Sequence, residues 1–313
     1  MAEQRIPGDL SRADIYGPRL AGGRLEPEAS WRRVWGFLCA LTQGRAAAEE
    51  QALEQRLAAT ATRLTRPNHV AVVSPKGGVG KTTSTLVTGE VLARHVRLRC
   101  VTVDANPDYG TLGLLAPDSV RSERSLADVL ARSDELEHAG SVRPFVSPLP
   151  SGLHVLAAPA DPRAMADLTP EHYARLLAVL DRFYEVVLLD LGTGLTDPLA
   201  RLALERSDQM VLVSTPEWVC AERVLAALDD LRATRAAERA TVVLNQAPPE
   251  GAAERQVVEA AFRRHDVGAR VAIPYDPQLR AMLDAGALDL GGLRRPTRMA
   301  LKRLGLAVAE ALA

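Results

Sequence analysis

Cysteine, aromatic residues and long hydrophobic runs are scarce in this sequence, and each shortage excludes a class of protein. The three cysteines, Cys39, Cys100 and Cys220, are far apart among 313 residues and show neither a disulfide framework nor metal-ligand spacing. Aromatic residues make up 4% of the chain, too few to predict a surface that stacks single-stranded nucleic acid. No apolar run reaches the roughly 18 residues that mark a membrane-spanning helix.

An excess of one charge is also missing. The chain has 38 basic and 39 acidic residues, so its net charge of −1 gives no general argument for binding nucleic acid or membrane. The polar N-terminus lacks the apolar segment of a signal peptide. With free thiols expected, these features predict a cytoplasmic protein. A hydrophobic content of 47% is ample for one large α/β domain with an extension.

One stretch, residues 70–83, has the order strand, glycine loop, helix. Val70 to Val73 are small or β-branched and predict a buried parallel strand. Glycines in the loop would let backbone N–H groups turn toward phosphate oxygens, at the partly positive N-terminus of a helix. Lys81 would reach the β- and γ-phosphates, and the Thr82 hydroxyl would bind Mg²⁺. The predicted phosphate-binding residues are Gly77, Gly78, Val79, Gly80, Lys81, Thr82 and Thr83.

The loop departs from the usual phosphate-loop pattern at two positions. Pro75 stands where a glycine is usual, and Lys76 adds a second lysine. The string Lys-Gly-Gly-Val-Gly-Lys-Thr-Thr resembles the deviant Walker A loop of the ParA/MinD family of ATPases. That resemblance implies ATP and Mg²⁺ as cofactors and a homodimer formed with ATP. Lys76 would then cross to the partner's nucleotide and offset repulsion between the facing phosphates.

Apolar segments alternate with helical patterns after residue 70. Strands are expected near residues 70–73, 99–104, 152–159, 185–190, 208–216, 240–245 and 269–274. The alternation predicts an α/β, doubly wound, mostly parallel sheet of seven to eight strands with helices on both faces, plus an N-terminal helical extension. We divide the chain into a disordered or loosely docked tail (1–30), the helical extension (31–66) and a ParA/MinD-like P-loop ATPase domain (67–313).

Acidic and amide residues follow several of these strands, at the edge of the sheet where ligands bind. Asp190 ends a strand in the manner of a Walker B acid, and with Thr82 and Asp104 it is a predicted Mg²⁺ site. Gly192 would bring a backbone N–H to the γ-phosphate. The family resemblance implies that Asn245 contacts the adenine and that the segment containing Pro274 and Asp276 lies near the base.

The segment Asp104-Ala105-Asn106-Pro107-Asp108 resembles switch I of the family, where the position of Asn106 is usually aspartate. That acid orients the attacking water, whereas an amide binds water but cannot accept its proton. We therefore predict slow ATP hydrolysis, with Asp108 as a possible substitute. The predicted catalytic residues are Lys76, Lys81, Asn106 and Asp108. The Asp-Ala-Asn-Pro string and the tryptophan-containing extension are similar to an actinobacterial MinD-like subgroup found with type VII secretion systems.

Two helical segments lie outside the strand pattern. Residues 31–42 have helical spacing, Gly44 is expected to break it, and residues 47–64 resume it with Leu53 and Leu57 on one face. This extension either packs on the core or docks a partner or a membrane surface. The C-terminal helix after Arg294 is interpreted as a core helix, with membrane-surface and non-specific DNA binding as less favoured alternatives.

The sequence thus favours an ATP-dependent dimerising switch ATPase that acts with an unidentified protein partner to position or regulate a larger assembly. One alternative is an ATP-binding switch with negligible hydrolysis that serves type VII secretion. A second is a partition ATPase that binds DNA without sequence preference. A third is a P-loop metabolic enzyme of similar fold, which would need a substrate pocket and would not need Lys76.

Overall fold

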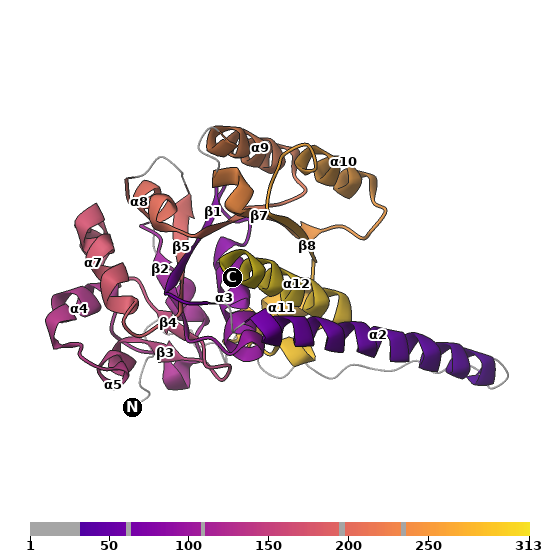
Figure 1. Ribbon diagram of the computed structural model, residues 1–313, viewed down its shortest axis with the longest axis horizontal. Coiled ribbons are helices and arrows are strands. Elements are labelled where there is room, and N and C mark those ends of the chain that lie inside the picture. The colour runs from indigo at the N-terminus through magenta and orange to yellow at the C-terminus, as the bar shows by residue number, and fades with distance from the viewer. Residues whose placement is uncertain (1–31, 61–63, 108–109, 194–197, 233–235) are drawn as a thin grey trace, which may run out of the picture.

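The computed structural model describes residues 32–60, 64–107, 110–193, 198–232 and 236–313 (Figure 1). These residues form one eight-stranded sheet with helices packed on both sides. The strands are β1 (Asn68–Ser74), β2 (Cys100–Ala105), β3 (Ser147–Pro148), β4 (His154–Leu156), β5 (Val186–Thr193), β6 (Gln209–Ser214), β7 (Ala240–Ala247) and β8 (Ala269–Pro274).

The sheet has the strand order β3-β4-β2-β5-β1-β6-β7-β8. Every pairing is parallel except that of β3 with β4, a short antiparallel pair at one edge. The strand that carries the glycine loop, β1, lies between β5 and β6 near the centre. The predicted doubly wound α/β class and strand number are confirmed, and β3 is the strand that the sequence pattern did not indicate.

The helices divide between the two faces of the sheet. They are α2 (Arg32–Thr60), α3 (Lys81–Val91), α4 (Leu126–Ala131), α5 (Ala139–Val142), α6 (Pro162–Ala166), α7 (Pro170–Leu180), α8 (Pro198–Arg206), α9 (Trp218–Arg232), α10 (Ala253–Phe262), α11 (Pro277–Asp284) and α12 (Arg295–Leu312). Helices α4 and α7 to α10 cover one face, and α2, α3, α11 and α12 cover the other (Figure 1).

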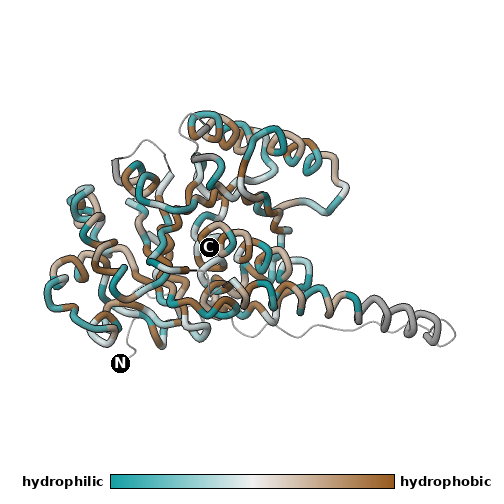
Figure 2. Tube along the Cα trace, viewed as in Figure 1, coloured by the Kyte–Doolittle hydropathy of each residue, from teal (hydrophilic) through white to brown (hydrophobic). Residues whose placement is uncertain are grey.

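Successive side chains of a strand point to opposite faces of the sheet, so alternate residues of β1 pack into the hydrophobic cores on its two sides. Ala71 and Val73 pack with the first set of helices, while Val70 and Val72 pack with the second. All four are buried, which is why the strand is continuously apolar rather than alternating. Figure 2 shows the apolar residues concentrated between the layers.

The N-terminal extension is one helix, and the predicted break at Gly44 is wrong. A mid-helix glycine costs only about 1 kcal/mol, and the alanine- and glutamate-rich sequence that follows Gly44 favours helix enough to continue through it. Leu53 and Leu57 are buried against the core, as their shared face predicts. The first half of α2 extends away from the body of the protein (Figure 1).

Helix α2 is also joined to α12 by ion pairs. Glu50 contacts both Arg298 and Lys302 at 2.5 Å, and Lys302 also bonds Glu54. Burial of Lys302 makes these carboxylates necessary, since an unpaired buried ammonium is strongly unfavourable. The arginine beside it holds the pKa of Glu50 at about 2.

The C-terminal helix α12 is a core helix, as the sequence analysis favoured. Ten of its residues are buried, and α2 covers its basic side. No helix in the described part of the chain is both long and apolar enough to span a membrane.

Gly305 marks the close approach of α12 to α3 and gives a test of this packing. A Cβ added there would lie 2.7 Å from Cβ of Val91 and closer still to one of its methyl groups. Gly305→Ala should therefore lower the free energy of unfolding by about 1–3 kcal/mol, although alanine is the better helix former. Urea denaturation measures this loss. Val91→Ala in the same chain should recover much of it, whereas additive losses would contradict the proposed contact.

Candidate nucleotide-binding site

The loop between β1 and α3 has the backbone geometry of an anion cradle. Gly78 and Gly80 have φ angles of +74° and +92°, which residues with a Cβ rarely adopt. A side chain at Gly80 would also collide with the amide of Asn245. Helix α3 then begins at Lys81 without a side-chain cap, so its first N–H groups face the loop.

The two lysines of the loop lie in different surroundings. Lys81 is buried, and this burial lowers the pKa of its ammonium group. The side chain of Lys76 is 37% exposed and pairs with Glu217, which raises the pKa of the lysine. Only Lys81 thus belongs to the interior of the phosphate cradle, while Lys76 is held at its surface.

Asp190 and Asp104 are buried neighbours in the carboxyl-terminal halves of β5 and β2, and β5 continues to Thr193 beyond the strand end predicted at Asp190. The two residues are directly opposite in the parallel ladder. Burial raises the pKa of Asp104 to about 7, with a contribution from the charge of Asp190, and burial raises the pKa of Asp190 to about 6. The hydroxyl of Thr85 donates to Asp190 over 3.3 Å, and Thr82 also donates to it.

This oxygen set fits a magnesium ion better than a soft metal. Hydroxyl and carboxylate oxygens are the ligands that Mg²⁺ prefers, and a cation would favour the ionised form of both acids. Thr82 and Asp190 would hold the ion at the phosphate loop, with Asp104 behind them. The ion would supply charge stabilisation at the β- and γ-phosphates.

Asp104 has a structural role that the sequence did not reveal. Its carboxylate accepts hydrogen bonds from the backbone N–H of Leu112 at 2.9 Å and of Asn106 at 3.4 Å. A Cβ at Gly110 would contact the same carboxylate at 2.4 Å. Asp104 therefore anchors the segment on both sides of Asp108, which itself lies outside the described residues.

Asn106 lies beside the end of β5. The position of a Cβ on Gly192 would be 3.0 Å from Oδ1 of Asn106 and 2.8 Å from the ring of Pro107. Only glycine allows this approach, so the structure brings together the two predicted γ-phosphate elements, Gly192 and Asn106.

The residues predicted near the base have other contacts. Asn245 is buried and donates its amide N–H to the carbonyl of Val79 at 2.8 Å, which joins β7 to the loop. The carboxylate of Asp276 caps α11 through the N–H of Gln278 and accepts from Thr297 at 2.6 Å. Pro274 ends β8. The base contacts of these three residues stay predictions.

Glu217 and Thr85 are site residues that the sequence analysis missed. Glu217 follows the carboxyl end of β6, the strand next to β1, so an acid just after a strand could have indicated it. Thr85 is one turn after Lys81 on α3, where a buried hydroxyl has no sequence signal. A cavity at β8 is lined by none of the loop residues, so backbone geometry and charge define the candidate phosphate site.

Comparisons with known proteins place the chain in a nucleotide-binding family. Residues 70–287 match the model of the "CobQ/CobB/MinD/ParA nucleotide binding domain". The ESX-1 secretion-associated protein EspI of Mycobacterium tuberculosis H37Rv is 34% identical over 228 residues, which cover 71% of this chain and 33% of EspI. The chromosome-partitioning ATPase Soj of Thermus thermophilus is 34% identical over 169 residues, covering 52% of this chain and 62% of Soj. The chain thus spans about a third of EspI.

Solved structures share the fold. A ParA family ATPase from Chlorobium tepidum superposes with a TM-score of 0.64 at 20% identity, covering 77% of this chain and 98% of that one. The septum site-determining protein MinD from Pyrococcus horikoshii, complexed with Mg-ADP, gives a TM-score of 0.61 at 22% identity, covering 76% and 94%.

The buried acids predict a pH dependence of stability. Because both pKa values lie above the ordinary value of 3.8, the folded state binds more protons than the unfolded state, and this contribution to stability falls as pH rises from about 4 to about 7. Asp104→Asn keeps an acceptor for Leu112. In the nucleotide-free protein it should stabilise the fold at pH 8 by at least about 1 kcal/mol.

Urea denaturation across this pH range measures the difference between variant and wild type, which should grow with pH. The exposed Asp134→Asn is the matched control and should show no such trend. A difference for Asp104→Asn that is constant with pH would mean that its carboxyl is not held protonated by burial.

Proposed function

Because the chain belongs to the CobQ/CobB/MinD/ParA family of nucleotide-binding domains, we propose that it is an ATP-dependent dimerising switch with slow ATPase activity. MgATP would bind at the loop between β1 and α3, with Lys81 on the β- and γ-phosphates. The dimer is proposed because the two lysines of the loop lie in different surroundings. Lys81 is buried within the cradle, whereas Lys76 is at the surface, where it can reach a second copy.

The surface around the loop supports this proposal. Six large hydrophobic residues are exposed in the described chain, and three of them, Leu114, Trp218 and Val219, follow the carboxyl ends of β2 and β6. These ends lie at the same edge of the sheet as the phosphate loop. A second copy that faces the loop would bury this apolar surface and bring Lys76 to its nucleotide.

In the monomer, Glu217 would hold Lys76 until ATP is bound. The pair is partly exposed, so its contribution to stability is small and its exchange for a phosphate partner is favourable. The phosphates of a facing nucleotide carry more charge than one carboxylate. Lys76 would therefore prefer the nucleotide when the second copy arrives.

We also propose that the protein has a role in secretion. The similarity to EspI supports a switch that serves a type VII secretion system, and the shared segment is the nucleotide-binding domain. The similarity to Soj supports DNA partition less well, because α2 covers and neutralises Arg298 and Lys302 of the C-terminal helix. A P-loop metabolic enzyme would not account for Lys76.

Lys76→Ala tests the dimer. The variant should bind ATP as wild type does, because Lys81 remains, but should stay monomeric in MgATP by multi-angle light scattering. Glu217→Gln is the matched control, since it removes the same ion pair from the other side and should still dimerise. If Lys76→Ala dimerises with ATP like wild type, the proposed role of this lysine is wrong.

Asn106→Asp tests why hydrolysis is slow. A carboxylate at this position can orient water and accept its proton, so phosphate release should rise by at least about tenfold in a single-turnover assay with Mg²⁺. Asn106→Ala, which restores neither function, should give no increase. An aspartate variant as slow as wild type would show that another step or residue limits the rate.

A further inference from the structure

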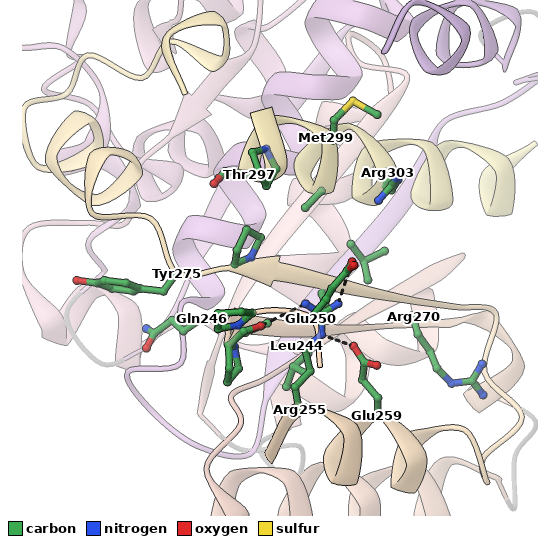
Figure 3. Close-up of a pocket in the computed structure, with 18 of the residues that line it drawn as sticks. Leu244, Gln246, Glu250, Arg255, Glu259, Arg270, Tyr275, Thr297, Met299 and Arg303 are labelled. Atoms are coloured by element: carbon green, nitrogen blue, oxygen red, sulfur yellow. Dashed lines mark hydrogen bonds and ion pairs between the residues drawn. The ribbon is translucent and has the colours of Figure 1, made fainter. Parts of the chain in front are cut away.

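A groove of about 1140 Å³ runs along the edge of the sheet at β8, between α10 and α12 (Figure 3). None of the phosphate-loop residues lines it. The groove is therefore separate from the phosphate cradle, and Pro274 is the one residue of the predicted nucleotide site among those that line it.

The strand in this groove has an unpaired edge. In the described chain β8 is the last strand of the sheet and pairs only with β7. Five of its six residues are partly or fully exposed, whereas the central strands β1, β2 and β6 are almost completely buried. An edge strand has a row of unpaired backbone N–H and C=O groups, and these can pair with one further strand.

The walls of the groove are strongly basic. They contain six arginines, which come from α10, β8, α12 and the residues just beyond these elements, against three glutamates. The arginines are Arg255, Arg263, Arg270, Arg294, Arg295 and Arg303, and the glutamates are Glu49, Glu250 and Glu259.

Two of these arginines, Arg270 and Arg303, are available to a ligand, whereas the other four pair with carboxylates of the described chain. Arg255 is occupied by Glu259 at 2.6 Å and Arg295 by Glu49 at 2.8 Å. Arg270 donates to the carbonyls of Phe262 and His265, so no carboxylate neutralises its charge within the described chain. Arg303 is exposed and has no carboxylate partner among the described residues.

The inner surface of the groove is apolar. It includes Leu244, Phe262, Val271, Met299 and Ala300. A nucleic acid would match the positive charge but not this apolar surface. An extended peptide matches both, because its side chains point alternately to opposite sides and its backbone can pair with β8.

We propose that this groove binds an acidic, extended segment of a partner protein, which adds a strand to the edge of β8. Apolar side chains of the segment would lie on Val271 and Ala272, which are partly exposed, and its carboxylates would pair with Arg303 and Arg270. Arginine forms two parallel hydrogen bonds with a carboxylate, which gives the recognition both strength and direction. The groove is formed within one copy, so the proposal is independent of nucleotide and of dimerisation.

Fluorescence anisotropy tests the proposal with a defined probe, a labelled peptide of about ten residues that alternates glutamate and valine, long enough to cover the six residues of β8. The full chain should bind it without nucleotide and should not bind the peptide with lysine in place of glutamate. Arg303→Glu should weaken binding by about tenfold or more. Arg201→Glu, the same change at an exposed position on α8, should leave binding unchanged.

Hydrogen exchange distinguishes strand addition from general attraction. Amides of β8 should exchange more slowly with the acidic peptide present, and those of β3 at the other edge should not change. The proposal is wrong if the peptide does not bind, if both charge reversals weaken it equally, or if β8 exchange is unaffected. If a DNA duplex binds more tightly than the peptide and its binding also depends on Arg303, the ligand of the groove is nucleic acid and the proposal of a peptide is wrong.

Discussion

The packing of two buried carboxylates, Asp104 and Asp190, is the constraint on which the site depends. Parallel pairing of β2 with β5 sets them opposite each other in the sheet. Burial raises both pKa values, and repulsion from the charge of Asp190 adds to the rise at Asp104. A divalent cation would relieve that repulsion, so binding a metal nucleotide and stabilising this end of the sheet become one event. Asp104 also anchors Leu112, which couples the segment around Asn106 to the same event.

The contact between α2 and α12 decides which surfaces remain for partners. Glu50 and Glu54 neutralise Arg298 and Lys302, and Leu53 and Leu57 cover the apolar side of the same region. An isolated amphipathic C-terminal helix could lie on a membrane or DNA, but this one is enclosed. Basic residues left outside that contact, such as Arg303, face the groove at β8 instead. The extension thus directs the positive charge of α12 to one side.

The features that could be predicted from the sequence are those that depend on residues close together in the chain. The run from Val70 to Thr83 contains its own strand, turn and helix start. The features that could not be predicted depend on contacts between residues far apart in the sequence. No pattern shows that Glu217 pairs with Lys76 over 141 residues of sequence. The helix through Gly44 is the exception, because the residues that follow it along the chain favour helix. The groove at β8 arises from α10, β8 and α12 together, so no single stretch indicates it.

The two lysines of the loop show why position matters more than composition here. Both are followed by glycine or by a helix start, and both carry the same charge, yet burial lowers the pKa of Lys81 while a carboxylate raises that of Lys76. A buried lysine needs an anion within the cradle, so Lys81 is suited to bind nucleotide in each copy. A surface lysine with an exchangeable partner is suited to respond to an anion that comes from outside. Under the proposed function, Lys81 would bind the nucleotide of its own copy, and Lys76 would respond to the nucleotide of a second copy.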